Sequence, residues 1–285
     1  MIKTAVILTV YNRREVTLQG FRTLYRAIGF LQKEQPDIDY KFDIYMTDDG
    51  CTDGTGEAVR KEFPDVHIIQ GDGTLYWSGG MRKAWQTAID SGIEYVFYLW
   101  FNDDANLYEN ALVTLFNSEK KAKGDAIISG AFCDSKGVVS YGGKGKNGDL
   151  MSPNSKIQTI YQLNGNFVLI PKKVFTSIGK ISKTYKHGYG DYDYGYRAQK
   201  AGFKVLLSPF FVGVTERHDV KEPKHFLDGM TFRNRWKGLH SAQYSPEVAF
   251  LFNLRYNGIL FAVKSYITSY IFTISPWIYK HRNIL

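Results

Sequence analysis

Two adjacent acidic residues, Asp103 and Asp104, follow an apolar run over residues 95–101. Neighbouring carboxylates repel each other unless a cation or hydrogen-bond donors compensate. Magnesium and manganese ions are typically held by one or two carboxylates together with the phosphates of a substrate. The pair therefore indicates a metal-bound diphosphate substrate or, with equal weight, a turn in which Asp104 caps the helix expected from Glu109 onward.

A second pair of carboxylates, Asp191 and Asp193, lies in a tyrosine- and glycine-rich stretch. The residues alone favour a helix N-cap at Asp191, because a helix is expected over 191–201. Asp193 lies about 200° further round that helix and could contact an acceptor or Arg197. His187, just before this helix, is a second candidate for contact with the acceptor.

Tyr11 and Asp49 lie at the ends of two further apolar runs. A carboxylate at a strand tip can accept the ring N–H of a pyrimidine, while an aromatic side chain supplies a stacking face. Capping of the next helix is the favoured role of the neighbouring Asp53 and Thr55. Tyr11 and Asp49 together therefore indicate a candidate nucleoside site.

Trp77 and Arg82 belong to a glycine-rich segment that follows the third apolar run. Trp77 could stack on a sugar or an acceptor, although an indole more often packs inside a protein. Arg82, expected just inside a helix N-terminus, could contact a diphosphate or remain a solvated charge.

The apolar runs predict the elements that position these residues. Four short runs, rich in β-branched or aromatic residues, are expected to be strands: 1–10, 42–47, 66–70 and 95–101. Three segments between them carry apolar residues at helical spacing or are expected helices: 16–28, 56–63 and 80–91. Such alternation predicts a Rossmann-like, mostly parallel sheet with helices on both faces. Ligands bind outside the carboxyl ends of such strands, where Asn102 and the residues discussed above lie.

The later part of the chain predicts further elements and a boundary. Strands are expected over 166–170 and 204–208, and an exposed loop over 144–155. We expect a catalytic domain over 1–220, with a nucleotide-binding half (1–105) and an acceptor-binding half (106–220). A basic, aromatic and helical appendage is expected over 221–285.

Six strings of the sequence resemble, in order and spacing, the family 2 glycosyltransferases of the GT-A fold, especially bacterial rhamnosyltransferase-like members that build surface polysaccharides. The strings span roughly residues 1–218 and are T-V-Y-N-R (9–13), D-D-G-C-T-D-G-T (48–55), G-D-G-T-L-Y-W-S-G-G-M (71–81), N-D-D-A (102–105), N-G-N-F-V-L-I-P (164–171) and G-D-Y-D-Y-G-Y-R-A-Q-K-A-G-F (190–203). Gly190 and Cys51 depart from the residues that are common at these positions in the family.

The resemblance implies a metal-dependent, inverting transfer of a sugar from a nucleotide-diphosphate donor, with UDP- or dTDP-sugars favoured. The acceptor would be a hydroxyl of a lipid-linked surface glycan, and the cofactor Mn²⁺ or Mg²⁺. Asp191 would be the base, Asp104 the metal ligand, and His218 would complete the metal or diphosphate site. The resemblance also implies four residues that hold the nucleoside and one that lies near its ribose or phosphates: Thr9, Tyr11, Arg13, Asp49 and Asp103.

Composition limits the other function classes. The chain of 285 residues has 44% hydrophobic and 22% charged residues, which is typical of globular proteins and excludes a disordered chain. Two cysteines, Cys51 and Cys133, and no signal-peptide pattern indicate a reducing, cytoplasmic location. No G-x-G-x-x-G follows the first run, which argues against a dinucleotide-dependent oxidoreductase. A sugar nucleotidyltransferase and an inactive glycan-binding or membrane scaffold protein remain alternatives.

Most of the net charge of +8 belongs to the C-terminal part, where residues 200–285 contain 12 Lys and Arg against 5 Asp and Glu. Residues 248–274 are apolar, but Arg255 and Lys264 interrupt them, so we expect helices that lie on the inner face of the cell membrane without crossing it. One helix face is expected to carry Asn253, Asn257, Lys264 and Thr268, and the membrane interface Trp236, Trp277 and Tyr279. A packed appendage or a homodimer interface is the alternative. No nucleic-acid-binding module accompanies the basic residues.

Overall fold

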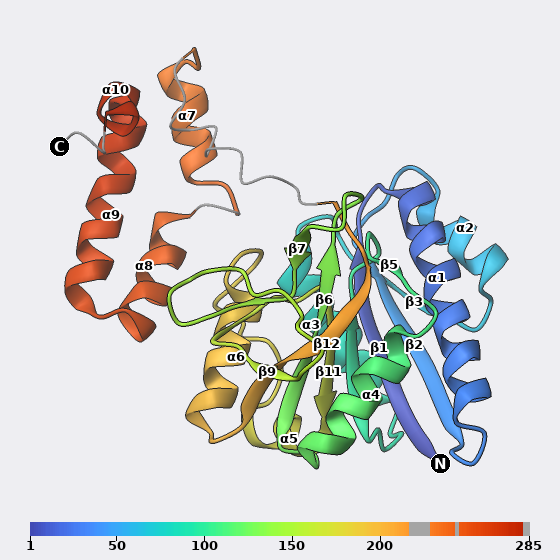
Figure 1. Cartoon of the computed structure of the whole chain (residues 1–285). Helices are drawn as coiled ribbons and strands as arrows, with labels where there is room; N and C mark the ends of the chain where they lie inside the picture. The colour runs from blue at the N-terminus through green and yellow to red at the C-terminus, as the bar shows by residue number, and fades with distance from the viewer. Residues whose placement is uncertain (217–228, 243–244, 282–285) are drawn as a thin grey trace. The chain divides into compact units, whose positions relative to one another are not determined.

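The computed structural model describes residues 1–216, 229–242 and 245–281, which form two compact units (Figure 1). The first unit comprises 1–182 and 190–216. The second comprises the described residues of the C-terminal part together with the short segment Lys183–Tyr189. This short segment ends directly before Gly190, and the predicted division into domains over 1–220 and 221–285 stays a prediction.

The first unit contains a large mixed sheet and six helices among its described residues. Its strands are β1 (Ile2–Val10), β2 (Tyr40–Asp48), β3 (His67–Gln70), β4 (Phe97–Phe101), β5 (Asn106–Leu107), β6 (Ala126–Cys133), β7 (Val139–Tyr141), β8 (Gly143–Lys144), β9 (Gln158–Thr159), β10 (Gln162–Leu163), β11 (Phe167–Pro171) and β12 (Lys204–Val214). Its helices are α1 (Arg14–Glu34), α2 (Thr55–Glu62), α3 (Tyr76–Asp90), α4 (Ala111–Ala122), α5 (Lys172–Ile178) and α6 (Gly190–Lys200).

The main path of the sheet has the strand order β3-β2-β1-β4-β11-β6-β12-β5. Strands β1 to β4 are parallel to one another, as β6 is to β12, whereas β11 runs antiparallel to both β4 and β6. In the parallel part, Val10 pairs with Asp48 and Asp48 with Gln70, so these strands end at the same edge. Because β11 runs the opposite way, it is its first residues that lie at this edge.

Side chains of each central strand alternate between two apolar cores, one on each face of the sheet. In β4, Phe97, Leu99 and Phe101 pack into the core that also contains side chains of α1, α2 and α4. Tyr98 and Trp100 pack on the opposite face, with side chains of α3, α5 and α6. Burial on both faces explains why the run is apolar throughout. The predicted mostly parallel sheet covered by helices on both faces is confirmed.

Two glycines allow helices to approach the chain segments that carry the strand ends. A Cβ at Gly20 in α1 would overlap the carbonyl oxygen of Asp103, and one at Gly80 in α3 would overlap the hydroxyl of Thr9. Helix α3 begins at Tyr76, one turn earlier than the sequence predicted, so Trp77 lies in its first turn.

The second unit contains α7 (Phe232–Leu239), α8 (Pro246–Tyr256), α9 (Ile259–Ile274) and α10 (Pro276–Lys280). Within it, the ring of Tyr189 stacks on that of Phe252 in α8, with centroids 4.5 Å apart. Gly258 has a φ of +88° and separates α8 from α9, so the predicted single face through Asn253, Asn257, Lys264 and Thr268 does not form. Among the described residues, no helix is both long and apolar enough to span a bilayer.

We predict that Gly20→Ala destabilises the protein by about 1–3 kcal/mol, because the new methyl group meets backbone that cannot rotate away. The measurement is the free energy of unfolding in urea. Gly29→Ala in the same helix is the matched control, since a Cβ there has no atom within 4 Å. It should stabilise by up to about 1 kcal/mol, because alanine favours the helix over glycine. Equal destabilisation by both variants would contradict the close approach at Gly20.

Candidate active site

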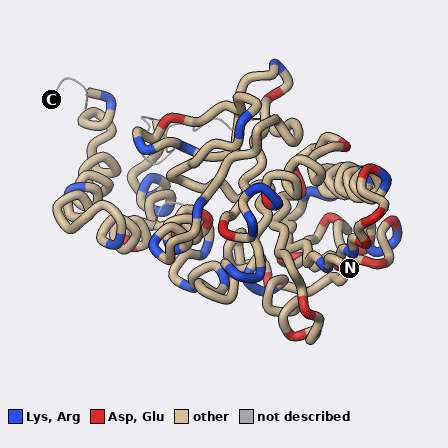
Figure 2. Tube along the Cα trace, turned by 60° about the horizontal axis from the view of Figure 1, so that its bottom comes forward, with Lys and Arg blue, Asp and Glu red and all other residues tan. Residues whose placement is uncertain are grey.

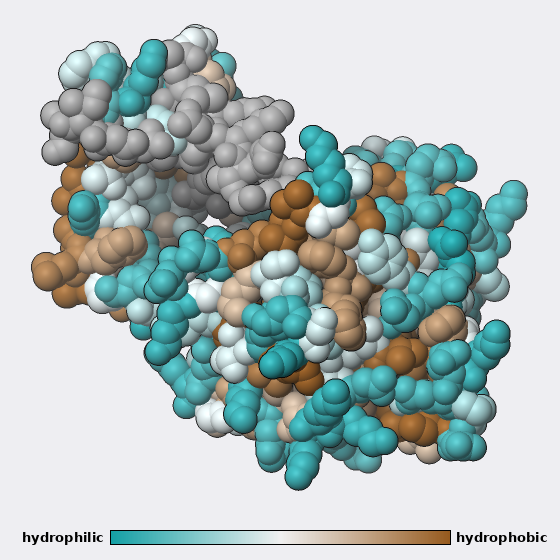
Figure 3. Space-filling model, in the orientation of Figure 1, coloured by the Kyte–Doolittle hydropathy of each residue, from teal (hydrophilic) through white to brown (hydrophobic). Residues whose placement is uncertain are grey.

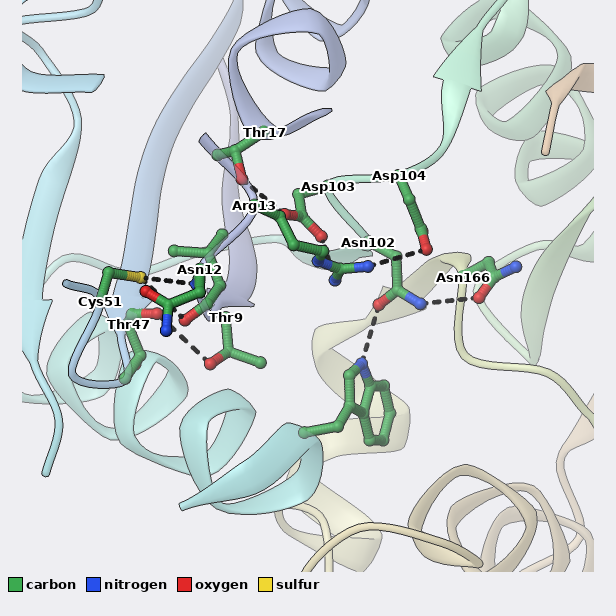
Figure 4. Close-up of polar contacts among 12 residues, drawn as sticks. Thr9, Asn12, Arg13, Thr17, Thr47, Cys51, Asn102, Asp103, Asp104 and Asn166 are labelled. Atoms are coloured by element: carbon green, nitrogen blue, oxygen red, sulfur yellow. Dashed lines mark hydrogen bonds and ion pairs between the residues drawn. The ribbon is translucent and has the colours of Figure 1, made fainter. Parts of the chain in front are cut away.

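The carboxylates of Asp103 and Asp104 are bridged by one arginine (Figure 4). Nη2 of Arg13 donates to Asp103 at 2.5 Å and Nη1 to Asp104 at 3.1 Å. The hydroxyl of Thr17 in α1 donates to the other oxygen of Asp103 at 2.6 Å. The repulsion expected between two adjacent carboxylates is thus compensated by a cation and a hydroxyl that belong to the chain itself.

Asp103 is buried, and both of its carboxylate oxygens are bonded within the protein. Its side chain is 0% exposed, and both of its oxygens are engaged by Arg13 and Thr17. Burial raises the pKa of Asp103 to about 6, while the Arg13 guanidinium opposes that rise. Asp103 therefore holds Arg13 and α1 in place through its two oxygens, and its position near the ribose or phosphates of a donor stays a prediction.

Asp104 is the accessible member of the pair, because 19% of its side chain is exposed. Within the described part of the chain, no group of three or more His, Cys, Asp or Glu side chains could hold a metal ion. Asp104 thus offers a single carboxylate, which fits an ion that takes its remaining ligands from substrate phosphates and water. His218, the other predicted ligand, lies outside the described residues.

Asn102, directly before this acidic pair, forms hydrogen bonds to α3 and to the segment before β11. Asn102 donates through its side-chain amide to Asn166 at 2.7 Å and accepts the indole N–H of Trp77 at 2.8 Å (Figure 4). The Trp77 ring also packs edge-on against Trp100. The site thereby fixes the indole and the end of β4 relative to each other. Asn166 was part of a matching string, but nothing in the sequence indicated this contact.

Asp191 lies beside the same indole. A Cβ at Gly165 would lie 2.7 Å from the Trp77 ring and 3.2 Å from the Cβ of Asp191, so the two side chains flank this glycine. The backbone N–H of Gly165 donates to one carboxylate oxygen of Asp191 at 3.1 Å, and Tyr192 N–H to the other at 2.9 Å. Burial nevertheless raises the pKa of Asp191 to about 6. A carboxylate with such a pKa is suited to accept a proton near neutral pH.

Asp193 and Arg82, both predicted to contact a substrate, form hydrogen bonds with other residues of the protein. The Asp193 side chain is 0% exposed and accepts from Arg197 Nε at 2.8 Å, so the predicted contact with an acceptor gives way to the alternative ion pair. Arg82 donates to the carbonyl oxygen of Ser182 at 2.8 Å. His187 belongs to the second unit, and burial lowers its pKa.

The residues predicted for the nucleoside lie at the ends of β1 and β2. Asp49 is 3% exposed and accepts hydrogen bonds from the backbone N–H groups of Gly73, Leu75 and Tyr76, so this residue at the end of β2 caps α3. A nucleoside base that bound Asp49 would have to share the carboxylate lone pairs that these three N–H groups use. Thr9 donates to the Thr47 carbonyl oxygen, whereas the Tyr11 ring is 54% exposed.

Three non-glycine residues next to the site have left-handed backbone conformations. They are Asn12, Tyr76 and Tyr189, with φ values of 48°, 53° and 68°. Each precedes by one or two positions a candidate residue: Arg13, Trp77 or Asp191. Such conformations cost of order 1 kcal/mol or more and cluster at functional sites. Asparagine adopts this conformation more readily than most residues, so Asn12 carried a weak signal in the sequence, whereas Tyr76 and Tyr189 carried none.

Comparison with known proteins supports the fold. No protein-family model and no curated protein matches the sequence. The structure is similar to that of a mannosyltransferase from Pyrobaculum calidifontis in complex with GDP-Man and Mn²⁺ (13% identity, TM-score 0.54), over 94% of this chain and 73% of that one. It is also similar to GalNAc-T7 with UDP, GalNAc and Mn²⁺ (13% identity, TM-score 0.55), over 90% of this chain and 50% of that chain. This chain thus spans about half the length of the second structure. The predicted GT-A fold is confirmed.

We predict that Asp193→Asn lowers the free energy of unfolding by about 3 kcal/mol, because it leaves the largely buried Arg197 guanidinium without its carboxylate. The control is Glu62→Gln, which breaks the exposed ion pair with Arg22 and should cost less than about 1 kcal/mol. Urea unfolding followed by circular dichroism measures both values. Similar small losses in the two variants would contradict the structural role of Asp193.

Proposed function

We propose that the protein is a metal-dependent, inverting glycosyltransferase that uses a nucleotide-diphosphate sugar. The observation that carries the proposal is the position of Asp191. This carboxylate has a raised pKa and lies next to Gly165, beside the Trp77 indole. The indole N–H donates to Asn102, the residue directly before Asp103 and Asp104. A general base and an acidic pair suited to a metal-bound diphosphate therefore lie at one edge of the sheet. The GT-A fold supports the same conclusion.

In this mechanism, Asp191 accepts the proton of an acceptor hydroxyl. The hydroxyl oxygen forms a bond to the anomeric carbon of the donor, and the bond between that carbon and the diphosphate oxygen breaks with the electron pair on the diphosphate. Trp77 presents a fixed ring next to the base, suited to packing on a sugar face. Because Trp77 donates its indole N–H to Asn102, the ring is held in one orientation.

The donor end of the site would be held by Asp104, Arg13 and the exposed ring of Tyr11. The chemistry that bound Mn²⁺ or Mg²⁺ supplies is neutralisation of the charge that develops on the departing diphosphate. Asp104 would be the protein ligand. Arg13 keeps its carboxylate oriented through Nη1, while Asp103 anchors the same guanidinium through Nη2.

Further parts of the proposal concern the substrates. The two similar structures bind GDP-Man in one case and UDP with GalNAc in the other, which supports a nucleoside-diphosphate donor. We propose a UDP- or dTDP-sugar as the donor and a hydroxyl of a lipid-linked surface glycan as the acceptor. The bacterial rhamnosyltransferase-like subfamily stays a prediction from the matching strings.

We predict that Asp191→Asn lowers kcat for sugar transfer by about 10²- to 10⁴-fold, because the amide cannot take the proton. Release of nucleoside diphosphate is measured with Mn²⁺, a panel of UDP-, dTDP- and GDP-sugars and mixed glycan acceptors. Binding of the donor, followed as a thermal shift, should stay within twofold of the wild type. The control is Asp149→Asn, the same chemical change in an exposed loop. Normal transfer by Asp191→Asn, or by wild-type protein in EDTA, would contradict the mechanism.

The pH profile identifies the base. The carboxyl of Asp191 is protonated below its pKa of about 6 and cannot then accept a proton, so kcat/KM should rise with pH through about 6 and level off above it. Asp103 has a similar pKa, so its titration needs to be separated by ¹³C NMR of the carboxyl groups. The resonance that follows the kinetic profile should disappear in Asp191→Asn. If it persists, Asp191 is not the titrating base.

A further inference from the structure

Helix α9 exposes its aliphatic residues along one face. Leu260, Val263, Ile267, Ile271 and Ile274 recur at intervals of three or four residues, which places them on one side of the helix. They are between 39% (Ile271) and 85% (Leu260) exposed. We call these five residues the outer face of α9. Figure 3 shows hydrophobic residues gathered on the surface of the C-terminal helices.

The inward side of the same helix carries small, hydroxyl-bearing and aromatic side chains and no aliphatic residue larger than alanine. Ala262 and Thr273 of α9 are buried, and the partly buried residues are Ser265, Tyr266, Thr268, Ser269, Tyr270 and Phe272. A helix of a water-soluble domain directs its apolar side towards the core. Helix α9 directs aromatic and hydroxyl-bearing side chains inward, where Tyr266 packs on Phe250 and Tyr270 on Trp236, and aliphatic side chains outward. Packing within the described part of this unit therefore does not account for the outer face.

Hydroxyl groups on the inward side of α9 form hydrogen bonds within the helix. Ser269 donates to the carbonyl oxygen of Ser265, and Thr273 to that of Ser269, both at 2.8 Å. At the C-terminal end of the helix, Arg235 Nε donates to the Thr273 carbonyl oxygen at 2.8 Å. Backbone and hydroxyl groups that are bonded within the protein can leave water without an unmet hydrogen bond. Helix α9 is thus compatible with a non-aqueous surrounding on its outer face.

The charges around this face indicate what covers it. The described residues of the second unit contain eight Lys and Arg but only one acidic residue, Glu247, and Figure 2 shows this excess of basic residues along the C-terminal helices. Arg255 and Lys264 are exposed, as is the Trp277 ring at 61%. Basic side chains and tryptophan near an aliphatic face are typical of the interface of an anionic membrane. A second copy of this unit would bring equal positive charges together.

We propose that the outer face of α9 inserts into the headgroup region of an anionic lipid membrane, with the helix axis parallel to the bilayer. A helix of 16 residues is about 24 Å long, shorter than the hydrocarbon core of about 30 Å, which is why it lies along the surface. Lys264, next to the aliphatic face, contacts lipid phosphate. Tyr279, predicted at the interface, is 8% exposed and packs within the unit instead, whereas Trp277 stays at the interface.

The inference deepens the proposed function and rests on it in one respect: a lipid-linked acceptor would be presented at such a surface. Binding to lipid itself does not depend on catalysis. Failure of the two proposals can therefore be distinguished, because vesicle binding is measured without donor or acceptor.

The test is co-sedimentation of the full chain with two kinds of vesicle. One contains phosphatidylcholine alone, and in the other about a third of the lipid is the anionic phosphatidylglycerol. We expect at least about tenfold stronger binding to the anionic vesicles, and binding that weakens with salt. The double variant Leu260→Gln, Ile267→Gln should lose at least about tenfold of this binding. The matched control is Val138→Gln, which replaces an exposed apolar residue of the first unit and should bind like wild type.

A second measurement separates lipid from a second copy. Sedimentation velocity without lipid should give the same oligomeric state for the wild type and for the double variant. Undiminished vesicle binding by the double variant, or equal binding of the wild type to neutral and anionic vesicles, would overturn the proposal. So would a wild-type dimer that the double variant converts to monomer. Unchanged helix content of the double variant, measured by far-ultraviolet circular dichroism, shows that the loss does not reflect unfolding.

Discussion

The site depends on the ion pairs that Arg13 forms with Asp103 and Asp104. A carboxylate as buried as Asp103 needs a counter-charge, and Arg13 supplies it while Thr17 donates to the remaining oxygen. Since Thr17 belongs to α1, these contacts hold the first loop, the first helix and the end of β4 together. Gly20 lets α1 come close enough for them to form. The same arginine leaves Asp104 oriented and partly exposed, which is the state that a metal ligand needs.

Strand direction then decides which other residues join this centre. The parallel strands β1 to β4 bring their carboxyl ends to one edge, and with them Thr9, Asp49 and Asn102. Strand β11 runs the opposite way, so the residues before it, Gly165 and Asn166, reach the same edge. Gly165 has no side chain, so the space that a Cβ would occupy lies against both the Trp77 ring and Asp191. The candidate base and the acidic pair are linked through this one antiparallel strand.

The second unit differs from the first in the types of residue that it exposes to solvent. In the first unit, aliphatic and aromatic residues of every central strand fill two cores. In α9 the aliphatic residues point outward, and hydroxyl-bearing and aromatic residues point inward. Contiguous exposed hydrophobic residues mark surfaces that contact a partner or a membrane. Together with the basic charge of the unit, this arrangement supports the proposed contact with a lipid surface.

The sequence by itself determined the alternation of strands and helices and the positions of polar residues at the strand ends, because hydrophobic periodicity is a local property. It could also name the Asp193–Arg197 pair, which spans one helical turn. Only the tertiary structure decided that Asp103 is buried against Arg13, 90 residues away, that Asp49 caps α3 and that Trp77 lies beside Asp191. Whether a carboxylate is exposed to solvent or buried depends on which distant segments pack around it. The residues next to it in the sequence do not specify those segments.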